Sequence, residues 1–221
     1  MFDILNLLDR HWTSIYDHEL TIAYNSLLFN SGLKHEYVDH SGYFTILFLS
    51  IFYNLLNLFD LLSVYKFSIF EQSENFNEDL NVLLFYARIF AALSVFIFIT
   101  LTFYIINYFT KSILFSLILT LIVLTSFGTI IHATQLRTEL LAMFFFLLAF
   151  FNLRLFFDRN KFFYFLFFLV FFYCAVLNKT QVFLYLPVIL FLGIFDSKKF
   201  TGINTSNFKF LEHKNVKYII I

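Results

Sequence analysis

The sequence predicts an all-α protein, a polytopic integral membrane helical bundle with amphipathic juxtamembrane helices on its outer face. Hydrophobic residues make up 60% of the 221 residues and charged residues only 14%, whereas about a quarter of a soluble globular chain is charged. The mean hydropathy is +0.79. Several apolar runs approach the roughly 20 residues that a helix needs to cross a bilayer. These observations exclude a disordered chain and leave little room for a water-soluble globule.

The charge balance and the cysteine content exclude further classes of protein. The net charge is zero, so nothing indicates nucleic acid as a partner. The single cysteine, Cys174, lies in an apolar run and excludes an internal disulfide framework.

The distribution of polar residues divides the chain into three parts. We expect residues 1–80 to form an outer-face loop with juxtamembrane helices, residues 81–196 a transmembrane helical bundle, and residues 197–221 a cytoplasmic loop with the start of a further transmembrane helix. The first residues are too polar for a signal peptide or a span, and the chain ends in an apolar run. We therefore expect a fragment of a longer protein; the alternative is a complete small protein whose N-terminal segment crosses without a signal.

Residues 18–30 predict an amphipathic helix that lies on the outer leaflet. Its apolar side chains recur at helical spacing on one face, and they are Leu20, Ala23, Tyr24, Leu27 and Leu28. Asp17 precedes the helix as a candidate N-cap, and Ser31-Gly32 follows it as a stop signal.

Residues 43–64 are apolar but contain Asn54, Asn57 and Asp60. These polar side chains disfavour a simple lipid-facing span. We expect either a second interfacial helix or a partial re-entrant one.

The rest of the chain alternates apolar runs with short polar breaks. The runs cover residues 82–108, 113–131, 140–157, 162–177 and 182–195. A single helix over residues 162–195 would be about 50 Å long and would bury Lys179. We therefore expect a hairpin with Lys179 at its tip, whose short arms tilt or thin the bilayer.

Lysine and arginine residues set the predicted orientation. When the loops alternate, most of these residues fall on the side of Lys111 and of the segment after residue 197, which is therefore predicted to be cytoplasmic. Residues 1–80, the loop 132–139 and the tip 178–181 then face outward. The sequence thus predicts a multi-pass protein of the cell inner (plasma) membrane.

Polar residues are dense in residues 11–40, beside the predicted membrane surface. Asp17 has two open interpretations, as a helix N-cap or as a catalytic base at the water–lipid boundary. Histidine and carboxylate side chains are suitable metal ligands, but no histidine pair there has i, i+4 spacing and no H-E-x-x-H motif occurs. We therefore predict no cofactor, with a divalent metal ion as the less favoured alternative.

The string Tyr16-Asp17-His18-Glu19, followed by Tyr37-Val38-Asp39-His40-Ser41-Gly42-Tyr43, resembles the first outer loop of GT-C superfamily glycosyltransferases. The most similar families are the protein-mannosyltransferase-like and aminoarabinose-transferase-like ones. The resemblance covers the N-terminal portion of such an enzyme. Ser41 departs from the proline of the family motif, and the family's first helix has no counterpart in this sequence.

Three later positions extend the resemblance. Arg88 matches an arginine at the start of the next helix in those enzymes, Arg137-Thr138-Glu139 matches an Arg-x-Glu element of a later outer loop, and Lys179 matches a lysine that precedes another apolar run. A charge inside a helix such as Arg88 is costly unless it is paired, and we expect Glu78 or Asp79 to be its partner. Asn178-Lys179-Thr180 also matches a glycosylation sequon, which we interpret as chance.

The resemblance implies an inverting membrane glycosyltransferase that moves a sugar from a polyprenyl-phosphate or polyprenyl-diphosphate donor to an acceptor on the extracytoplasmic face. The acceptor would be a glycan, a lipid or a protein, and membrane lipids would be further partners. Asp17 would be the general base that deprotonates the acceptor hydroxyl. Glu19 would position the acceptor or share the base role.

The same resemblance implies a set of substrate-binding residues. Arg137 and Lys179 would bind the leaving phosphate, because a guanidinium gives bidentate contacts and an ammonium gives a compact charge. The other members of the set are Arg88 as a third cation, His40, which would order its loop or contact the donor, and Glu139.

Two other functions stay open from the sequence. One is a non-enzymatic polytopic membrane protein, such as a transporter or assembly subunit fragment, and the other is an inactive fragment. Transporters place ionisable groups near the bilayer midplane, whereas Lys111 is the only charged residue in residues 89–131. The candidate residues gather instead on the outward face, which favours chemistry at the membrane boundary.

Overall fold

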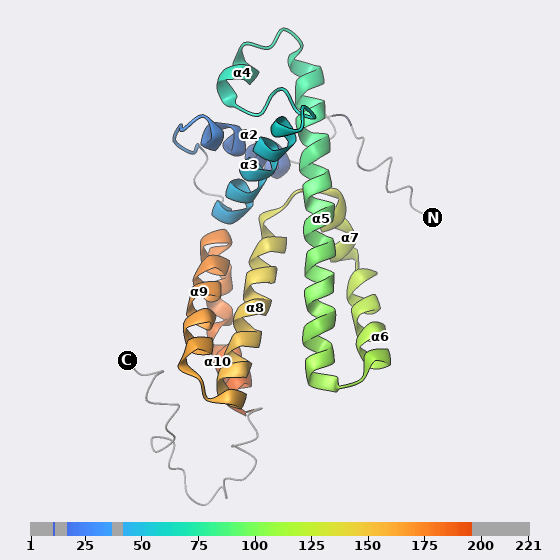
Figure 1. Cartoon of the computed structure of the whole chain (residues 1–221), viewed down its shortest axis with the longest axis vertical. Coiled ribbons are helices and arrows are strands. Elements are labelled where there is room, and N and C mark those ends of the chain that lie inside the picture. Colours follow the sequence, from blue (N-terminus) through green and yellow to red (C-terminus); the bar gives the residue numbers. More distant parts are fainter. Residues whose placement is uncertain (1–10, 12–16, 37–41, 196–221) are drawn as a thin grey trace, which may run out of the picture. The chain divides into compact units, whose positions relative to one another are not determined.

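The computed structural model describes residue 11, residues 17–36 and residues 42–195 (Figure 1). The predictions for His40 and for residues 197–221 lie outside these residues, as does the side chain of Asp17. All regular secondary structure in the described ranges is helical, which confirms the predicted all-α class.

The described elements follow one another in a simple order. They are α2 (Asp17–Asn30), α3 (Tyr43–Leu58), α4 (Phe67–Glu71), α5 (Phe76–Thr110), α6 (Ile113–Leu124), α7 (Phe127–Thr134), α8 (Thr138–Arg159), α9 (Phe162–Asn178), the 3-10 helix η2 (Thr180–Tyr185) and α10 (Leu186–Phe195).

These elements form two compact units. The first comprises the described residues up to Ala142 together with Leu177–Lys179, and the second comprises Met143–Val176 and the described residues from Thr180 onward. Each unit has its own internal packing.

Among the described residues, two helices, α5 and α8, are long and apolar enough to cross a membrane. The helices α6 and α7 pass the same test only as a pair, and they are bent by 63° at the break between them. The predicted runs 82–108 and 140–157 are therefore confirmed as span-length helices. The helices α3, α9 and the segment Thr180–Leu190 are apolar but shorter.

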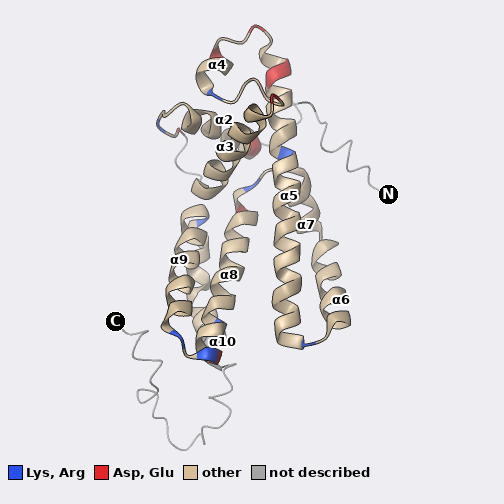
Figure 2. Ribbon diagram, in the orientation of Figure 1, with Lys and Arg blue, Asp and Glu red and all other residues tan. Residues whose placement is uncertain are grey.

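The helix α5 is the axis of the first unit (Figure 1). Its N-terminal part packs against α2 and α3, and its later part packs against α6 and α7. The stretch from Ile89 to Thr110 contains no charged residue and is about 33 Å long at 1.5 Å per residue, close to the roughly 30 Å of a bilayer core. This stretch is uniformly tan in Figure 2, and Lys111 follows it.

The helix α2 buries most of its predicted apolar face and several polar residues as well. Ala23, Leu27 and Leu28 are 2–3% exposed, whereas Leu20 is 38% exposed. On the polar side, Glu19 is 4% exposed and Ser26 is fully buried. The Ser26 hydroxyl donates to the carbonyl oxygens of Ile22 and Ile46 at 2.8 and 3.2 Å. Since α3, α4 and α5 all contact α2, partners are available for its polar residues, and the helix is buried on most of its circumference.

The predicted stop of this helix at Ser31-Gly32 is confirmed. Gly32 has φ +68°, and the amide of Leu33 donates to the carbonyl of Leu28 at 3.0 Å. This is the left-handed helix ending that glycine makes without a steric penalty.

The helix α3 ends at Leu58 and its asparagines are used inside the protein. Asn54 Nδ2 donates to Asn30 Oδ1 of α2 at 2.6 Å, and Asn57 Nδ2 donates to the Leu62 carbonyl at 3.0 Å. These contacts agree with the prediction that residues 43–64 are not a simple lipid-facing span.

The second unit is built largely from phenylalanine contacts between the later part of α8, α9 and η2. Phe145 stacks on Phe171 with ring centroids 6.5 Å apart, and Phe172 contacts Phe183 at 6.4 Å. The predicted break between the two apolar runs is confirmed, because α9 ends at Asn178 and a 3-10 helix begins at Thr180.

Candidate functional site

A buried ion pair joins α2 to α5. Arg88 Nε lies 3.3 Å from Glu19 Oε1, and Arg88 Nη2 lies 3.4 Å from Glu19 Oε2. The two side chains are 1% and 4% exposed. Glu19 also accepts a hydrogen bond of 3.2 Å from the backbone amide of Leu136. The carboxylate of Glu19 thus links three segments that are distant in the sequence.

This pair corrects the partner expected for Arg88. Glu78 and Asp79 lie about 15 Å away along the same helix, too far to reach the guanidinium directly. Asp79 instead accepts a hydrogen bond from the hydroxyl of Ser73. The position of Arg88 at the junction with α2 explains why Glu19 is its partner.

Tyr53 of α3 completes the surroundings of this pair. Its side chain is fully buried, and its hydroxyl donates to the Leu83 carbonyl at 3.0 Å. Burial raises the pKa of Tyr53 well above its ordinary value, and the negative charge of Glu19 raises it further. The phenol therefore stays neutral and keeps its donor proton.

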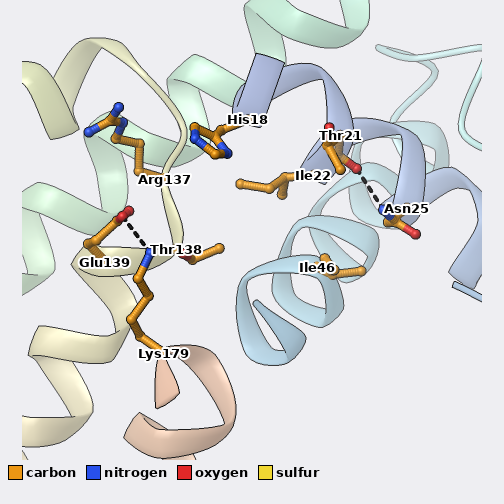
Figure 3. A pocket seen from close by; sticks show the side chains of 9 residues that line it. All are labelled: His18, Thr21, Ile22, Asn25, Ile46, Arg137, Thr138, Glu139 and Lys179. Atoms are coloured by element: carbon orange, nitrogen blue, oxygen red, sulfur yellow. Dashed lines mark hydrogen bonds and ion pairs between the residues drawn. The ribbon is translucent and has the colours of Figure 1, made fainter. Parts of the chain in front are cut away.

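An open pocket lies in the first unit, and His18, the residue before Glu19, is part of its lining (Figure 3). It holds about 390 Å³ of empty space, including its open mouth. Side chains from α2, from α3, from residues 137–139 and from Lys179 line it. The lining residues are His18, Thr21, Ile22, Asn25, Ile46, Arg137, Thr138, Glu139 and Lys179.

The charges of this pocket come from two stretches that are far apart in the sequence. Lys179 Nζ lies 2.8 Å from Glu139 Oε1, and the two side chains are 29% and 38% exposed. No residue in the described ranges forms an ion pair with Arg137, which lines the same pocket. The lining therefore carries one more positive than negative charge when histidine is neutral.

A buried asparagine holds the lysine side of the pocket. Asn178 Oδ1 accepts hydrogen bonds from the Thr45 amide at 3.0 Å and from the Thr45 hydroxyl at 3.1 Å. Asn178 Nδ2 donates to the Thr138 carbonyl at 2.6 Å. The side chain of Asn178 is fully buried, which agrees with the interpretation of its sequon as chance.

The structure brings most of the predicted site residues together. Glu19, Arg88, Arg137, Glu139 and Lys179 all belong to the first unit, either in the ion pair or in the pocket lining. Asp17 is the first residue of α2 and directly precedes His18, which lines the pocket.

Sequence reasoning missed the polar residues that position this site. Asn178 stood out only as part of a sequon and Thr45 not at all, because asparagine and threonine are common in this chain and their partners are distant in the sequence. The position of Asn178 at the end of an apolar run could have indicated a buried amide. Such a group needs hydrogen-bond partners, because buried polar groups are rarely left unpaired.

In the part of the chain that the structure describes, no group of three or more histidine, cysteine, aspartate or glutamate side chains could hold a metal ion. Comparison of the chain with protein-family models, with curated proteins and with solved structures gives no match.

Proposed function

We propose that this protein is a GT-C type membrane glycosyltransferase, which transfers a sugar from a polyprenyl-phosphate-linked donor to an acceptor on the extracytoplasmic face. The observation that carries the proposal is the pocket shared by Arg137, Lys179 and the start of α2. In that pocket, two cations from separate loops meet the segment whose sequence resembles the acidic motif of these enzymes.

The level of the pocket along α5 supports a substrate that sits at the membrane boundary. Arg88 directly precedes the uncharged stretch of α5 that begins at Ile89. Glu19 contacts Arg88 and the amide of Leu136, so the adjoining His18 and Arg137 belong to the same end of that stretch. A lipid with a phosphate headgroup presents its charge at this level while its chain stays in the hydrocarbon.

Arg137 and Lys179 are suited to bind the donor phosphate. A guanidinium donates two parallel hydrogen bonds to phosphate oxygens, and an ammonium adds a compact point charge. Both cations would stabilise the negative charge that the leaving phosphate gains as the glycosidic bond breaks.

We assign the acceptor activation to Asp17 on the resemblance of its motif. Its carboxylate takes the proton of the acceptor hydroxyl, whose oxygen forms a bond to the anomeric carbon. The bond between that carbon and the phosphate oxygen breaks on the opposite face, and the electron pair leaves with the lipid phosphate. The configuration at the anomeric carbon is thereby inverted.

Glu19 is better suited to a positioning role than to the base role. Its carboxylate is 4% exposed and already accepts hydrogen bonds from Arg88 and from the Leu136 amide. These contacts occupy the carboxylate and leave little room for a substrate hydroxyl beside it. We propose that Glu19 fixes the turn that carries Arg137.

The proposed function requires the protein to lie in a membrane with its pocket on the outer side. We infer that the protein is a multi-pass protein of the cell inner membrane and that the pocket opens on its outer face. The support is the distribution of basic residues in the sequence, which puts Lys111 on the cytoplasmic side and the loop 132–139 outside.

The test is a transfer assay with the purified protein in lipid nanodiscs and labelled polyprenyl-phosphate sugars. We expect Asp17→Asn to lower sugar transfer by about a hundredfold or more, as loss of a general base does, without change in insertion or folding. Lys179→Ala should weaken donor binding, whereas the control Lys66→Ala, which removes a cation outside the pocket, should change neither. Unchanged transfer by Asp17→Asn would remove that residue from the base role.

The same assay separates the rival function. If the wild-type protein binds polyprenyl-phosphate sugars through Lys179 but transfers no sugar from any of them, the proposal of an enzyme is wrong. A non-enzymatic role in binding or moving the lipid would then be favoured.

A further inference from the structure

We infer that Asn178 is a positioning residue, whose buried amide brings Lys179 to Glu139 and to the pocket. The inference rests on the proposed function in one respect, namely that Lys179 binds the donor phosphate. Its evidence and its test concern only the position of that lysine, so they do not depend on sugar transfer.

The backbone at Lys179 belongs to no helix. The helix α9 ends at Asn178, and the 3-10 helix η2 begins at Thr180. Helical hydrogen bonds therefore do not fix the direction in which the Lys179 side chain leaves the chain. Something else has to hold this residue if its ammonium is to stay in one place.

The amide group of Asn178 supplies that restraint. It receives two hydrogen bonds from Thr45, at the start of α3, and donates one to the carbonyl of Thr138, at the start of α8. All three side chains are buried, at 0%, 0% and 7% exposure for Asn178, Thr45 and Thr138. Buried hydrogen bonds of this kind define one arrangement, because leaving any of the groups unpaired is costly.

The contact of Asn178 with Thr138 directly precedes the ion pair of Lys179 with Glu139 along both segments. Asn178 binds the Thr138 carbonyl, and the next residue, Lys179, binds the carboxylate of the next residue, Glu139. The buried contact thus sets the position at which the partly exposed ion pair forms. Removing it should free Lys179 without touching either charged group.

The reactivity of the Lys179 amine measures this position directly. A lysine nitrogen that lies against a carboxylate, as Nζ of Lys179 does at 2.8 Å from Glu139 Oε1, is less accessible to an acylating reagent than one that extends into water. We would treat the full chain in lipid nanodiscs with a water-soluble N-hydroxysuccinimide ester and follow acylation of Lys179 by peptide mass spectrometry.

We expect Asn178→Ala to raise the acylation rate of Lys179 by up to about fivefold, the range that corresponds to loss of a partly exposed ion pair. The acylation rate of Lys179 in Glu139→Gln is the reference for complete loss of the ion pair, because that variant removes the carboxylate partner of Lys179. The matched control is Asn30→Ala. Asn30 also joins three segments, through Ser50, Asn54 and the Tyr65 carbonyl, but it does not line the pocket. That variant should leave the rate unchanged.

A milder pair of variants keeps the test decisive if Asn178→Ala does not fold. Thr45→Val removes one hydrogen bond to Asn178 and should raise the rate, whereas Thr45→Ser keeps the hydroxyl and should restore the wild-type value. A wild-type rate in both folded Asn178→Ala and Thr45→Val would overturn the inference. A raised rate in a protein that transfers no sugar would uphold the inference and refute the proposed function.

Discussion

Lys179 Nζ lies 2.8 Å from Glu139 Oε1, although forty residues separate them in the chain. One of the two cations of the pocket is thus already neutralised, and the other, Arg137, lines the same space. An anionic ligand would have to share Lys179 with Glu139 or displace it.

The first prediction concerns Glu139. Glu139→Gln should strengthen the binding of polyprenyl monophosphate by up to about fivefold, because the loss of a partly exposed ion pair is worth no more than about 1 kcal/mol. Native mass spectrometry of the protein with that lipid measures the change. Glu71→Gln, which removes an exposed carboxylate of α4, is the control. Weaker binding by Glu139→Gln would mean that Glu139 contacts the ligand favourably.

The second prediction concerns the buried pair of Glu19 and Arg88. Glu19→Ala should lower the free energy of unfolding by about 3–5 kcal/mol, because it leaves a buried guanidinium without this partner. Adding Arg88→Met should recover part of the loss, since the buried charge that Glu19 had neutralised is then gone. Denaturant titration in mixed micelles measures both. Strictly additive losses in the double variant would show that the two residues do not stabilise the fold as a pair.

The third prediction concerns Gly32 at the end of α2. A Cβ atom there would meet no atom within 4 Å, but the backbone has φ +68°. Gly32→Ala should therefore cost about 1 kcal/mol of stability through the backbone alone. Gly128→Ala is the matched control, because that site in α7 is equally open. A helical glycine replaced by alanine should gain about 0.5–1 kcal/mol, and a gain at both positions would contradict the left-handed ending.

The fourth prediction concerns the pH dependence that Tyr53 gives to stability. Its pKa is raised in the folded protein, so the unfolded chain loses this proton at a lower pH than the folded one. The contribution is complete below the ordinary tyrosine pKa of about 10 and falls as the pH rises above it. The loss of stability between pH 9 and pH 11 (about one unit on either side of that value) should be smaller in Tyr53→Phe than in the wild type. Identical slopes would contradict a buried, neutral phenol.

Hydrophobic pattern predicted the class of the protein well. The apolar runs at residues 82–108 and 140–157 correspond to α5 and α8, because a run of some twenty apolar residues has few stable forms other than a helix. The end of α2 at Ser31-Gly32 and the interruption between α9 and η2 at Lys179 were also predictable from the sequence, since they depend on local backbone chemistry.

The same pattern predicted only part of the buried surface of α2. Ala23, Leu27 and Leu28 of the predicted apolar face are buried, but so are Glu19 and Ser26. A hydropathy pattern treats polar residues as exposed. It does not include the hydrogen-bond and ion-pair partners that α3 and α5 provide for them.

The sequence alone determined that the chain is apolar and helical, where the span-length helices α5 and α8 and the break at Lys179 fall, and which charges lie beside them, because these properties depend on composition and on neighbours within a turn or two. It did not reveal the bend between α6 and α7 within the apolar run 113–131. The tertiary structure alone decided that Arg88 pairs with Glu19 and that Asn178 binds Thr45 and Thr138. Each of those contacts joins residues tens of positions apart, and only the packing of whole helices determines which buried polar groups can satisfy one another.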